Sequence, residues 1–298
     1  MWPLVRAMVG ALVGYLIGIT VTVVAGLGGV NSEVALVFGY TLGLVGWLYG
    51  IGLGRTWVRE WRGLPARPDD IEGWRRYLTF STDHKVIGVQ YLATFIAVLV
   101  LGGISALLMR IELSQAGETI MNAERFNMVM SMHGILMVAV AVAAVLGSFG
   151  NFMVPIMIGA DDMAFPRLNA LSFWLLPMAG IIFVASFLVP GGAFDAGWTG
   201  YAPLSTGAPL GQSFFNIGVQ FAGASSIATA LNFLVTIITM RAPGMNLWRM
   251  PLLVWANLST SLLVVGATPF VAGAQFMVFF DRILGMNFFN FLEGGDVI

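Results

Sequence analysis

The sequence contains no cysteine and only two histidines, and charged residues make up just 10% of its 298 positions. Without cysteine the chain has no disulfide framework, no thiolate metal site and no cysteine nucleophile. Hydrophobic residues reach 58%, with 22 phenylalanines and 9 tryptophans, and the mean hydropathy is +0.87. This balance lies far outside that of soluble domains. It indicates an integral membrane protein, for which we expect no nucleic-acid partner.

Seven apolar runs are close to or above the roughly 20 residues needed to cross the hydrocarbon core of a bilayer. They are residues 7–30, 34–53, 86–109, 127–159, 170–189, 214–240 and 252–280. All should be helices, since a segment exposed to lipid must satisfy its own backbone hydrogen bonds. The sequence therefore predicts an all-α transmembrane bundle of seven spans, the first of them a retained helix rather than a signal peptide.

Basic residues are distributed unevenly between these runs. If residue 1 starts inside, 11 of the 14 basic residues lie in inside segments and only Arg110, Arg125 and Arg282 lie outside. The positive-inside rule then places the N-terminus in the cytoplasm, and we expect a bacterial plasma membrane. The chain divides into an N-terminal hairpin at 1–54, a basic cytoplasmic connector at 55–85 and five core spans at 86–298. Glycines 10, 14 and 18 in the hairpin predict close approach of its two helix backbones.

His133 is the only ionisable side chain between residues 127 and 159. Polar groups inside a bilayer need partners, so an intramembrane histidine is a functional-site hypothesis, and its ring is a common metal ligand. The chemistry alone supports two interpretations of His133 equally well. Its ring either makes an interhelical hydrogen bond to serine or asparagine or binds a metal ion or a haem.

Charged residues at the ends of the runs are ambiguous on their own. Asp161 and Asp162 lie beside Arg167 in an inside loop, a pattern more typical of a solvated face than of a proton entrance. Arg110 fits an interfacial cation paired with Glu112, or a donor to an anionic or carbonyl group of a cofactor. His84 lies in a polar turn, and we expect a surface residue without a role.

Short motifs occur in order between residues 81 and 233. They are STDHKVIG at 81–88, LMRIEL at 108–113, GNFMVPIMIG at 150–159, DMAFPRLN at 162–169, SFWLLP at 172–177, GWTGYAPL at 197–204, GASS at 223–226 and NF at 232–233. In these motifs the chain resembles subunit I of the haem-copper oxidases, and most closely the cytochrome c oxidase branch, over roughly residues 77–298.

The resemblance implies roles for individual residues. It makes His133 one of two axial ligands of a low-spin haem, expected to be haem a, and Arg110 a hydrogen-bond donor to the haem periphery. It makes Asp162 the entrance of a proton pathway from the inside, the D-pathway. Further pathway residues would be Asn151 and Asn169 near the entrance, with Tyr91, Ser225, Ser226 and Asn232 higher up, where hydroxyl and amide groups can order water. Glu112 matches a residue near a peripheral cation site.

The resemblance also implies ligands beyond residue 298: those of the high-spin haem and copper, and the second ligand of the low-spin haem. We therefore expect that this chain alone cannot reduce oxygen, and that it is one piece of a split subunit or a truncated sequence. Its partners would be the remainder of subunit I, oxidase subunits II and III, cytochrome c or another donor, and the lipid bilayer. Alternatives are a quinol oxidase or nitric oxide reductase of the same superfamily, or a secondary transporter in which His133 and Asp162 bind substrate or relay protons.

Overall fold

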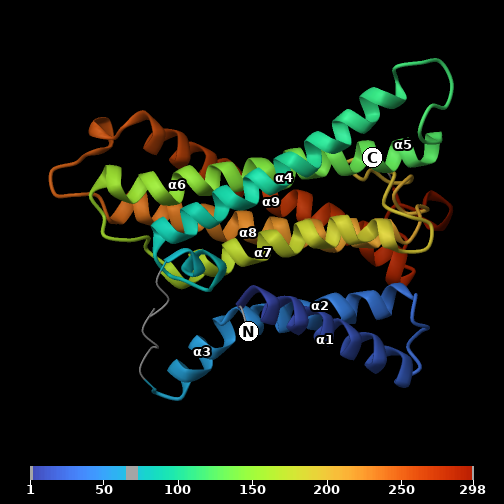
Figure 1. The fold of residues 1–298 in the computed structure, drawn as a ribbon, viewed down its shortest axis with the longest axis horizontal. Coiled ribbons are helices and arrows are strands. Elements are labelled where there is room, and N and C mark those ends of the chain that lie inside the picture. The colour runs from blue at the N-terminus through green and yellow to red at the C-terminus, as the bar shows by residue number, and fades with distance from the viewer. Residues whose placement is uncertain (1–2, 65–72, 297–298) are drawn as a thin grey trace.

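The structure, a computed structural model, describes residues 3–64 and 73–296, and within these ranges seven helices are long and apolar enough to cross a membrane. The predicted all-α bundle is confirmed. The helices are α1 (Pro3–Val24), α2 (Glu33–Ile51), α4 (His84–Glu112), α5 (Ala123–Ile135) continuing into α6 (Val142–Ile158), α7 (Pro166–Ala185), α8 (Gly211–Thr239) and α9 (Leu252–Leu284). Figure 1 shows α4 to α9 side by side, with α1 and α2 along one side of them. Part of the predicted connector, residues 65–72, lies outside the described residues.

The helix boundaries follow the predicted runs except at the first outside turn. The prediction that the first span extends to residue 30 is wrong, because α1 ends at Val24. Gly26 and Gly28 adopt φ angles of +68° and +157°, which end a helix because they are incompatible with helical backbone. The predicted fourth span forms one helical stretch of 36 residues, Ala123–Ile158. Within this stretch, Leu136–Ala141 is π-helical instead of α-helical.

The N-terminal hairpin packs backbone to backbone, as its glycine spacing predicts. A Cβ atom added to Gly10, Gly14 or Gly18 would collide with the backbone of α2. The hairpin also contacts the bundle, since the Trp47 Nε1–H donates to the Trp174 carbonyl at 3.1 Å. The close approach of α1 and α2 is therefore a consequence of absent side chains at one face of each helix.

Short helices cover the inside and the ends of the bundle. α3 (Leu53–Trp61) is amphipathic and follows α2, and one-turn helices lie at Gly73–Leu78, Ser186–Leu188, Leu247–Arg249 and Phe291–Glu293. Glu60 on α3 pairs with Arg167 at the start of α7, at 2.6 Å. This ion pair ties the connector to the inside end of the core helices.

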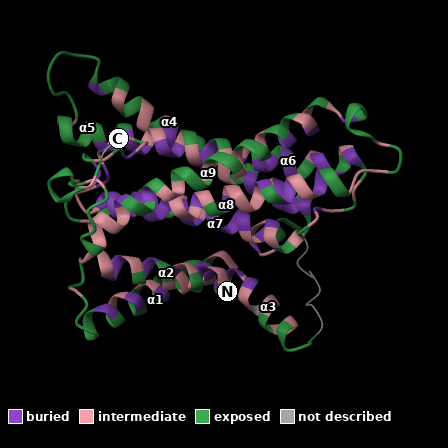
Figure 2. Cartoon of the chain, turned by 180° about the vertical axis from the view of Figure 1, so that it is seen from behind, coloured by how far each residue is buried: buried purple, intermediate pink, exposed green. Residues whose placement is uncertain are grey.

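The core is concentrated on α7 and α8, which pack against each other in the middle of the bundle (Figure 2). Aromatic side chains from both helices and from the outside loop interlock there; Phe183, Phe194 and Phe215 are all buried, with ring centroids 4.7 to 6.2 Å apart. The loop at 190–213 closes the outside end, where the Gly197 N–H donates to Ser131 Oγ at 3.0 Å. This outside loop is thus part of the core, with the Phe194 side chain fully buried.

Candidate functional site

Helix α4 gives a scale of depth for the polar residues inside the bundle. Three residues of α4 make hydrogen bonds to other helices of the bundle. They are His84 in the first turn of α4, Tyr91 further along and Gly102 near the middle of the helix. At 1.5 Å per residue, Tyr91 lies about 10 Å and Gly102 about 27 Å along the axis from His84. The candidate residues therefore occupy separate levels.

Asp162 lies at the inside level and is half-buried, whereas its neighbour Asp161 is exposed. One carboxylate oxygen accepts the Met163 N–H at 2.7 Å. Burial raises the pKa of the Asp162 carboxyl above its ordinary value, and Asp83 adds to this rise; the Met163 and His84 backbone N–H groups and the charge of His84 partly oppose it. A carboxyl with a raised pKa exchanges protons closer to neutral pH. The structure thus distinguishes Asp162 from Asp161.

The prediction that His84 is a surface residue is wrong. Its side chain is buried, with 3% of its surface exposed, and Nδ1 lies 2.7 Å from the Asn151 carbonyl oxygen on α6. The cause is the cap of α4, because Asp83 Oδ1 accepts the Lys85 N–H at 2.7 Å and starts the helix at His84. The ring is thereby directed inward, between α4 and α6.

Asn151 and Asn169 are fully buried and only partly hydrogen-bonded. Asn151 Nδ2 donates to the Gly147 carbonyl at 2.7 Å, but its Oδ1 has no partner in the structure, and neither side-chain atom of Asn169 has one. Buried amide atoms of this kind are rare in native proteins and normally bind ordered water. The two predicted entrance residues therefore supply orphaned polar atoms beside the inside level.

Helix α8 carries a polar stripe of four residues spaced four, three and four apart: Ser225, Thr229, Asn232 and Thr236. This spacing places them on one face of the helix. The Asn232 amide accepts the Phe165 N–H at 2.9 Å and donates to the Phe165 carbonyl at 3.2 Å, and Thr236 Oγ1 accepts the Ala164 N–H at 2.9 Å. The inner half of the stripe thus fixes the loop that carries Asp162.

The outer half of the stripe meets Tyr91 in a hydroxyl network. The Tyr91 hydroxyl lies 3.2 Å from Ser172 Oγ and 3.1 Å from Thr229 Oγ1. Ser225 Oγ donates to the Ser172 carbonyl at 2.7 Å. Ser172 and Thr229 are missing from the sequence-based prediction, although Thr229 could have been found from its spacing in the stripe.

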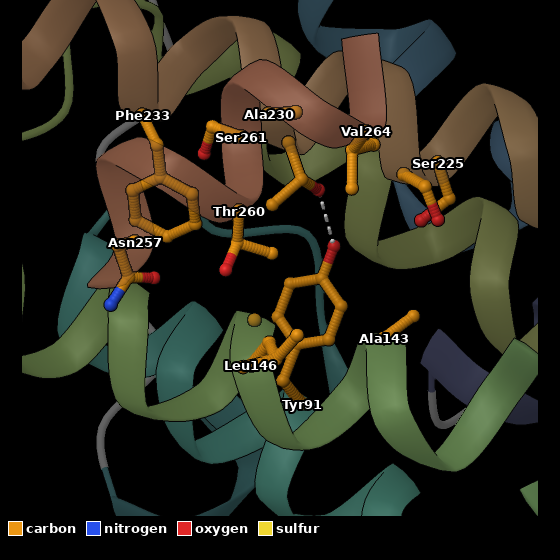
Figure 3. Close-up of a pocket in the computed structure, with 13 residues that line it drawn as sticks. Tyr91, Ala143, Leu146, Ser225, Ala230, Phe233, Asn257, Thr260, Ser261 and Val264 are labelled. Carbon is orange, nitrogen blue, oxygen red and sulfur yellow. Dashed lines mark hydrogen bonds between the residues drawn. The ribbon is translucent and has the colours of Figure 1, made fainter. Parts of the chain in front are cut away.

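A cavity of about 60 Å³ opens beside this network (Figure 3). It is lined by Tyr91, Ser225, Ser226 and Thr229 together with residues of α9. A single water needs roughly 10–15 Å³ of such space and two to four polar partners, so the cavity has room for several waters. The structure therefore brings Tyr91, Ser225 and Ser226 together around one cavity, whose wall combines their hydroxyl groups with apolar side chains such as Leu146 and Val264.

His133 lies on α5 beside Gly102 of α4, the level furthest from the inside. Its Nδ1 is 2.9 Å from the Gly102 carbonyl oxygen, and because a carbonyl only accepts, Nδ1 carries the proton. Nε2 then keeps its lone pair and can bind a metal. The π-helical segment at Leu136–Ala141 begins three residues later, and such segments occur frequently at functional sites. The ring makes an interhelical hydrogen bond, but to a backbone carbonyl rather than to serine or asparagine.

The two histidines cannot bind one metal ion together, because His84 and Gly102, the partner of His133, lie about 27 Å apart along α4. Residues 3–64 and 73–296 contain no group of three or more His, Asp or Glu side chains that could hold a metal ion. The donor set therefore fits a cofactor that takes one axial imidazole from this chain. It does not fit a metal site built by this chain alone.

Arg110 and Glu112 lie in the last turn of α4, and Arg110 is about 12 Å beyond Gly102. Arg110 is exposed and makes no hydrogen bond to another residue that the structure describes. The Glu112 carboxylate accepts the N–H groups of Thr119, Ile120 and Met121 at 3.0, 2.7 and 2.9 Å. The structure does not bring Arg110 into contact with His133, so the haem contact of Arg110 and the cation site at Glu112 stay predictions.

Several known proteins have sequences similar to that of this chain. The sequence model of the family described as Cytochrome C and Quinol oxidase polypeptide I matches residues 86–298. The chain belongs to this family. Cytochrome c oxidase subunit 1 of Thermostichus vulcanus is 46% identical over 237 residues, which cover 79% of this chain and 42% of the relative.

Two further members of the polypeptide I family show the same coverage. Cytochrome c oxidase subunit 1 of Synechocystis sp. is 43% identical over 226 residues, 76% of this chain and 41% of the relative. Probable cytochrome c oxidase subunit 1-alpha of Streptomyces avermitilis is 42% identical over 226 residues, 75% of this chain and 39% of the relative. The chain thus spans about two-fifths of the length of these relatives, and its membership favours an oxidase over a secondary transporter.

Proposed function

We propose that this chain is the N-terminal portion of the catalytic subunit of a proton-pumping cytochrome c oxidase that reduces O2 to water. The observation that carries the proposal is the oriented imidazole of His133, whose Nδ1–H is held by the Gly102 carbonyl at 2.9 Å and whose Nε2 remains available. Membership of the polypeptide I family supports a haem as the group that such a ligand would bind.

In this proposal Nε2 of His133 would hold a low-spin haem, haem a, and Arg110 would donate a hydrogen bond to the same group. Such a haem would supply one-electron transfer. The Gly102 carbonyl fixes the tautomer and the direction of the ring, as outer partners of ligating histidines commonly do. The second axial ligand, the high-spin haem and the copper would be held by sequence outside residues 1–298.

The proposed proton route starts at Asp162 on the inside. The carboxylate collects protons, and the orphaned amides of Asn151 and Asn169 bind the first waters. Asn232 holds the entrance loop in place through Phe165. From there Ser225, Ser226 and the hydroxyl network of Tyr91 lead along the polar face of α8 toward the level of the cavity. Hydroxyl and amide groups suit this task because they order water without fixing a charge.

The proposed setting is a bacterial plasma membrane with the N-terminus in the cytoplasm, supported by the excess of basic residues in the inside segments. The hairpin at 1–54 would be an addition to the five core spans at 86–298, joined through the connector at 55–85. The partners would be the rest of subunit I, subunits II and III, and cytochrome c as electron donor, supported by the names of the relatives.

Replacing the proposed ligand tests the proposal. In the assembled complex, His133→Ala should abolish the low-spin haem absorption, because the substitution removes the imidazole that the Gly102 carbonyl holds in place. The matched control is the second histidine: His84→Gln should leave the low-spin band intact, since His84 lies about 27 Å away along α4. An unchanged low-spin spectrum in His133→Ala would refute the ligand role.

A further inference from the structure

Helix α9 contributes polar side chains to the cavity beside Tyr91 that neither the motifs nor the proposed route includes. They are Asn257, Thr260 and Ser261, which lie within about one turn of each other and all line the cavity. In Figure 3, Thr260 and Asn257 lie across the space from the ring of Tyr91. The cavity therefore has polar groups on the α9 side as well as on the α8 side.

The α9 side chains are placed there by close packing of the surrounding helices. Asn257 and Ser261 are 8% and 4% exposed. A Cβ added to Gly150 on α6 would lie 2.7 Å from Asn257 Oδ1, so the missing side chain at Gly150 makes room for this oxygen. Asn257 Nδ2 donates to the Leu253 carbonyl at 2.9 Å, which leaves Oδ1 as an acceptor. The amide is thus held in one orientation.

The hydroxyls at the cavity differ from others on the same bundle. Thr94 and Thr239 donate to the carbonyl four residues back, at 3.1 and 2.7 Å, as hydroxyls in apolar surroundings do. All three remaining hydroxyls, those of Ser226, Thr260 and Ser261, border the cavity. None of these hydroxyl groups makes a hydrogen bond to another residue that the structure describes. Polar groups without protein partners beside a space of this size are water-binding groups.

We propose that the cavity holds a cluster of ordered waters bound between the two walls, with Asn257, Thr260 and Ser261 of α9 as positioning residues of the proton route. This inference rests on the proposed function, because it extends the route that begins at Asp162. The hydroxyl network of Tyr91, Ser172 and Thr229 delivers the proton to the cluster, and the α9 wall orients the waters that carry it onward. The three residues themselves gain and lose no net proton.

Apolar replacements of similar shape test the α9 wall in the assembled oxidase complex. Asn257→Leu combined with Thr260→Val should slow proton uptake about tenfold, the factor expected from losing roughly one hydrogen bond to the moving charge. Uptake is followed with a pH-sensitive dye after oxygen is mixed with the reduced complex. Haem content should stay unchanged, and so should the phases of electron transfer that need no proton. If the three residues had only a structural role, their replacement would disturb these properties as well.

Three further variants make the result specific. Ser259 is an exposed serine on the same helix, and Ser259→Ala should leave proton uptake at the parent rate. Serine in place of valine at position 260 keeps the hydroxyl group, so Thr260→Ser should restore most of the uptake rate that is lost in Thr260→Val. Ser261→Ala removes a single oxygen atom, so it tests the wall even if the double variant fails to assemble. It should slow uptake by several-fold.

Asp162→Asn, measured in parallel, separates the two proposals. If Asp162→Asn slows uptake while the α9 variants keep the parent rate, the α9 wall is overturned and the proposed route stands. If Asp162→Asn also keeps the parent rate, the proposed route fails and the α9 wall fails with it. Slowing in Asp162→Asn and in the α9 variants, but not in Ser259→Ala, supports both.

Discussion

At the scale of single residues, the backbone around His133 determines what the side chain can do. The Gly102 carbonyl accepts its Nδ1–H at 2.9 Å, and Gly102 itself has no side chain to displace the neighbouring helix. A Cβ at this position would lie 2.5 Å from Met137 Sδ and 3.9 Å from His133 Nδ1. Gly102 is therefore a second requirement for the site, one that the sequence motifs do not reveal.

Gly102→Ala should weaken haem binding by roughly tenfold, the lower end of what loss of an outer partner of a ligand costs. The added methyl must push Met137 aside or separate α4 from the π-helical segment, and either change moves the carbonyl that orients the ring. The measurement is the amplitude and position of the low-spin absorption band. Gly103→Ala is the control, because a Cβ there meets nothing within 4 Å; equal spectra for both variants would contradict this role.

Asp162 allows a prediction in which stability and function change in opposite directions. Burial raises its pKa in the folded protein, so ionising it costs folding free energy. That cost is absent below the ordinary aspartate pKa, grows as the pH rises through the raised pKa, and is complete above it. Asp162→Asn removes the cost and keeps an oxygen that can accept the Met163 N–H.

The thermal midpoint of Asp162→Asn should therefore exceed that of the parent at neutral pH, and the difference should disappear as the pH falls below the ordinary aspartate value. The effect is small, since Asp162 is half-exposed and solvent screens it. Midpoints measured from about pH 3 to about pH 8, which extends below the ordinary aspartate pKa, provide the test. A variant less stable than the parent at neutral pH would show that the carboxylate is stabilising instead.

At the scale of elements, the ends of the helices were less predictable than their existence. Hydropathy gave all seven spans, because about 20 apolar residues have few alternatives in a membrane. It misplaced the end of α1, which glycines at 26 and 28 determine, and it gave no sign that the cap at Asp83 turns His84 inward. The family motifs drew attention to Tyr91, Ser225 and Ser226, which the structure places beside one cavity, while their role in a proton pathway stays a prediction. The α9 wall and Ser172 could not be assigned, because the packing of separate helices brings them there.

The contact between α2 and α9 also depends on tertiary packing. Arg282 near the end of α9 is 4% exposed, pairs with Glu33 at 2.7 Å and donates to four backbone carbonyls between residues 205 and 209. Glu33 lies in the first turn of α2. The hairpin thus supplies the counter-charge of a buried arginine that fixes the outside loop.

Glu33→Gln should lower the free energy of unfolding by about 1–3 kcal/mol, because it leaves the buried guanidinium without an opposite charge while keeping a hydrogen-bond acceptor. Thermal unfolding of the purified complex measures the effect. Glu118→Gln, at an exposed position in the loop after α4, is the control and should change stability little. If the two variants unfold at the same temperature, the ion pair contributes nothing to the docking of the hairpin.

At the scale of the whole molecule, the residues of the two proposed functions lie at different depths. Asp162 and His84 lie at the inside end of the bundle, Tyr91 and the cavity lie about 10 Å deeper, and His133 lies about 27 Å from the inside level. The polar face of α8 connects the first two levels over about 16 Å. A proton route that enters from one side and approaches a cofactor bound nearer the other is the arrangement that a proton pump requires.

The measurement that tests this account most directly is the number of protons pumped per electron by the complex reconstituted in vesicles, compared between Asp162→Asn and Asp161→Asn. The two aspartates are adjacent, but only Asp162 is half-buried against the start of α4. The account predicts that Asp162→Asn lowers turnover or abolishes pumping with haem content intact, while Asp161→Asn behaves like the parent. Parent values of turnover and pumping in Asp162→Asn would contradict it.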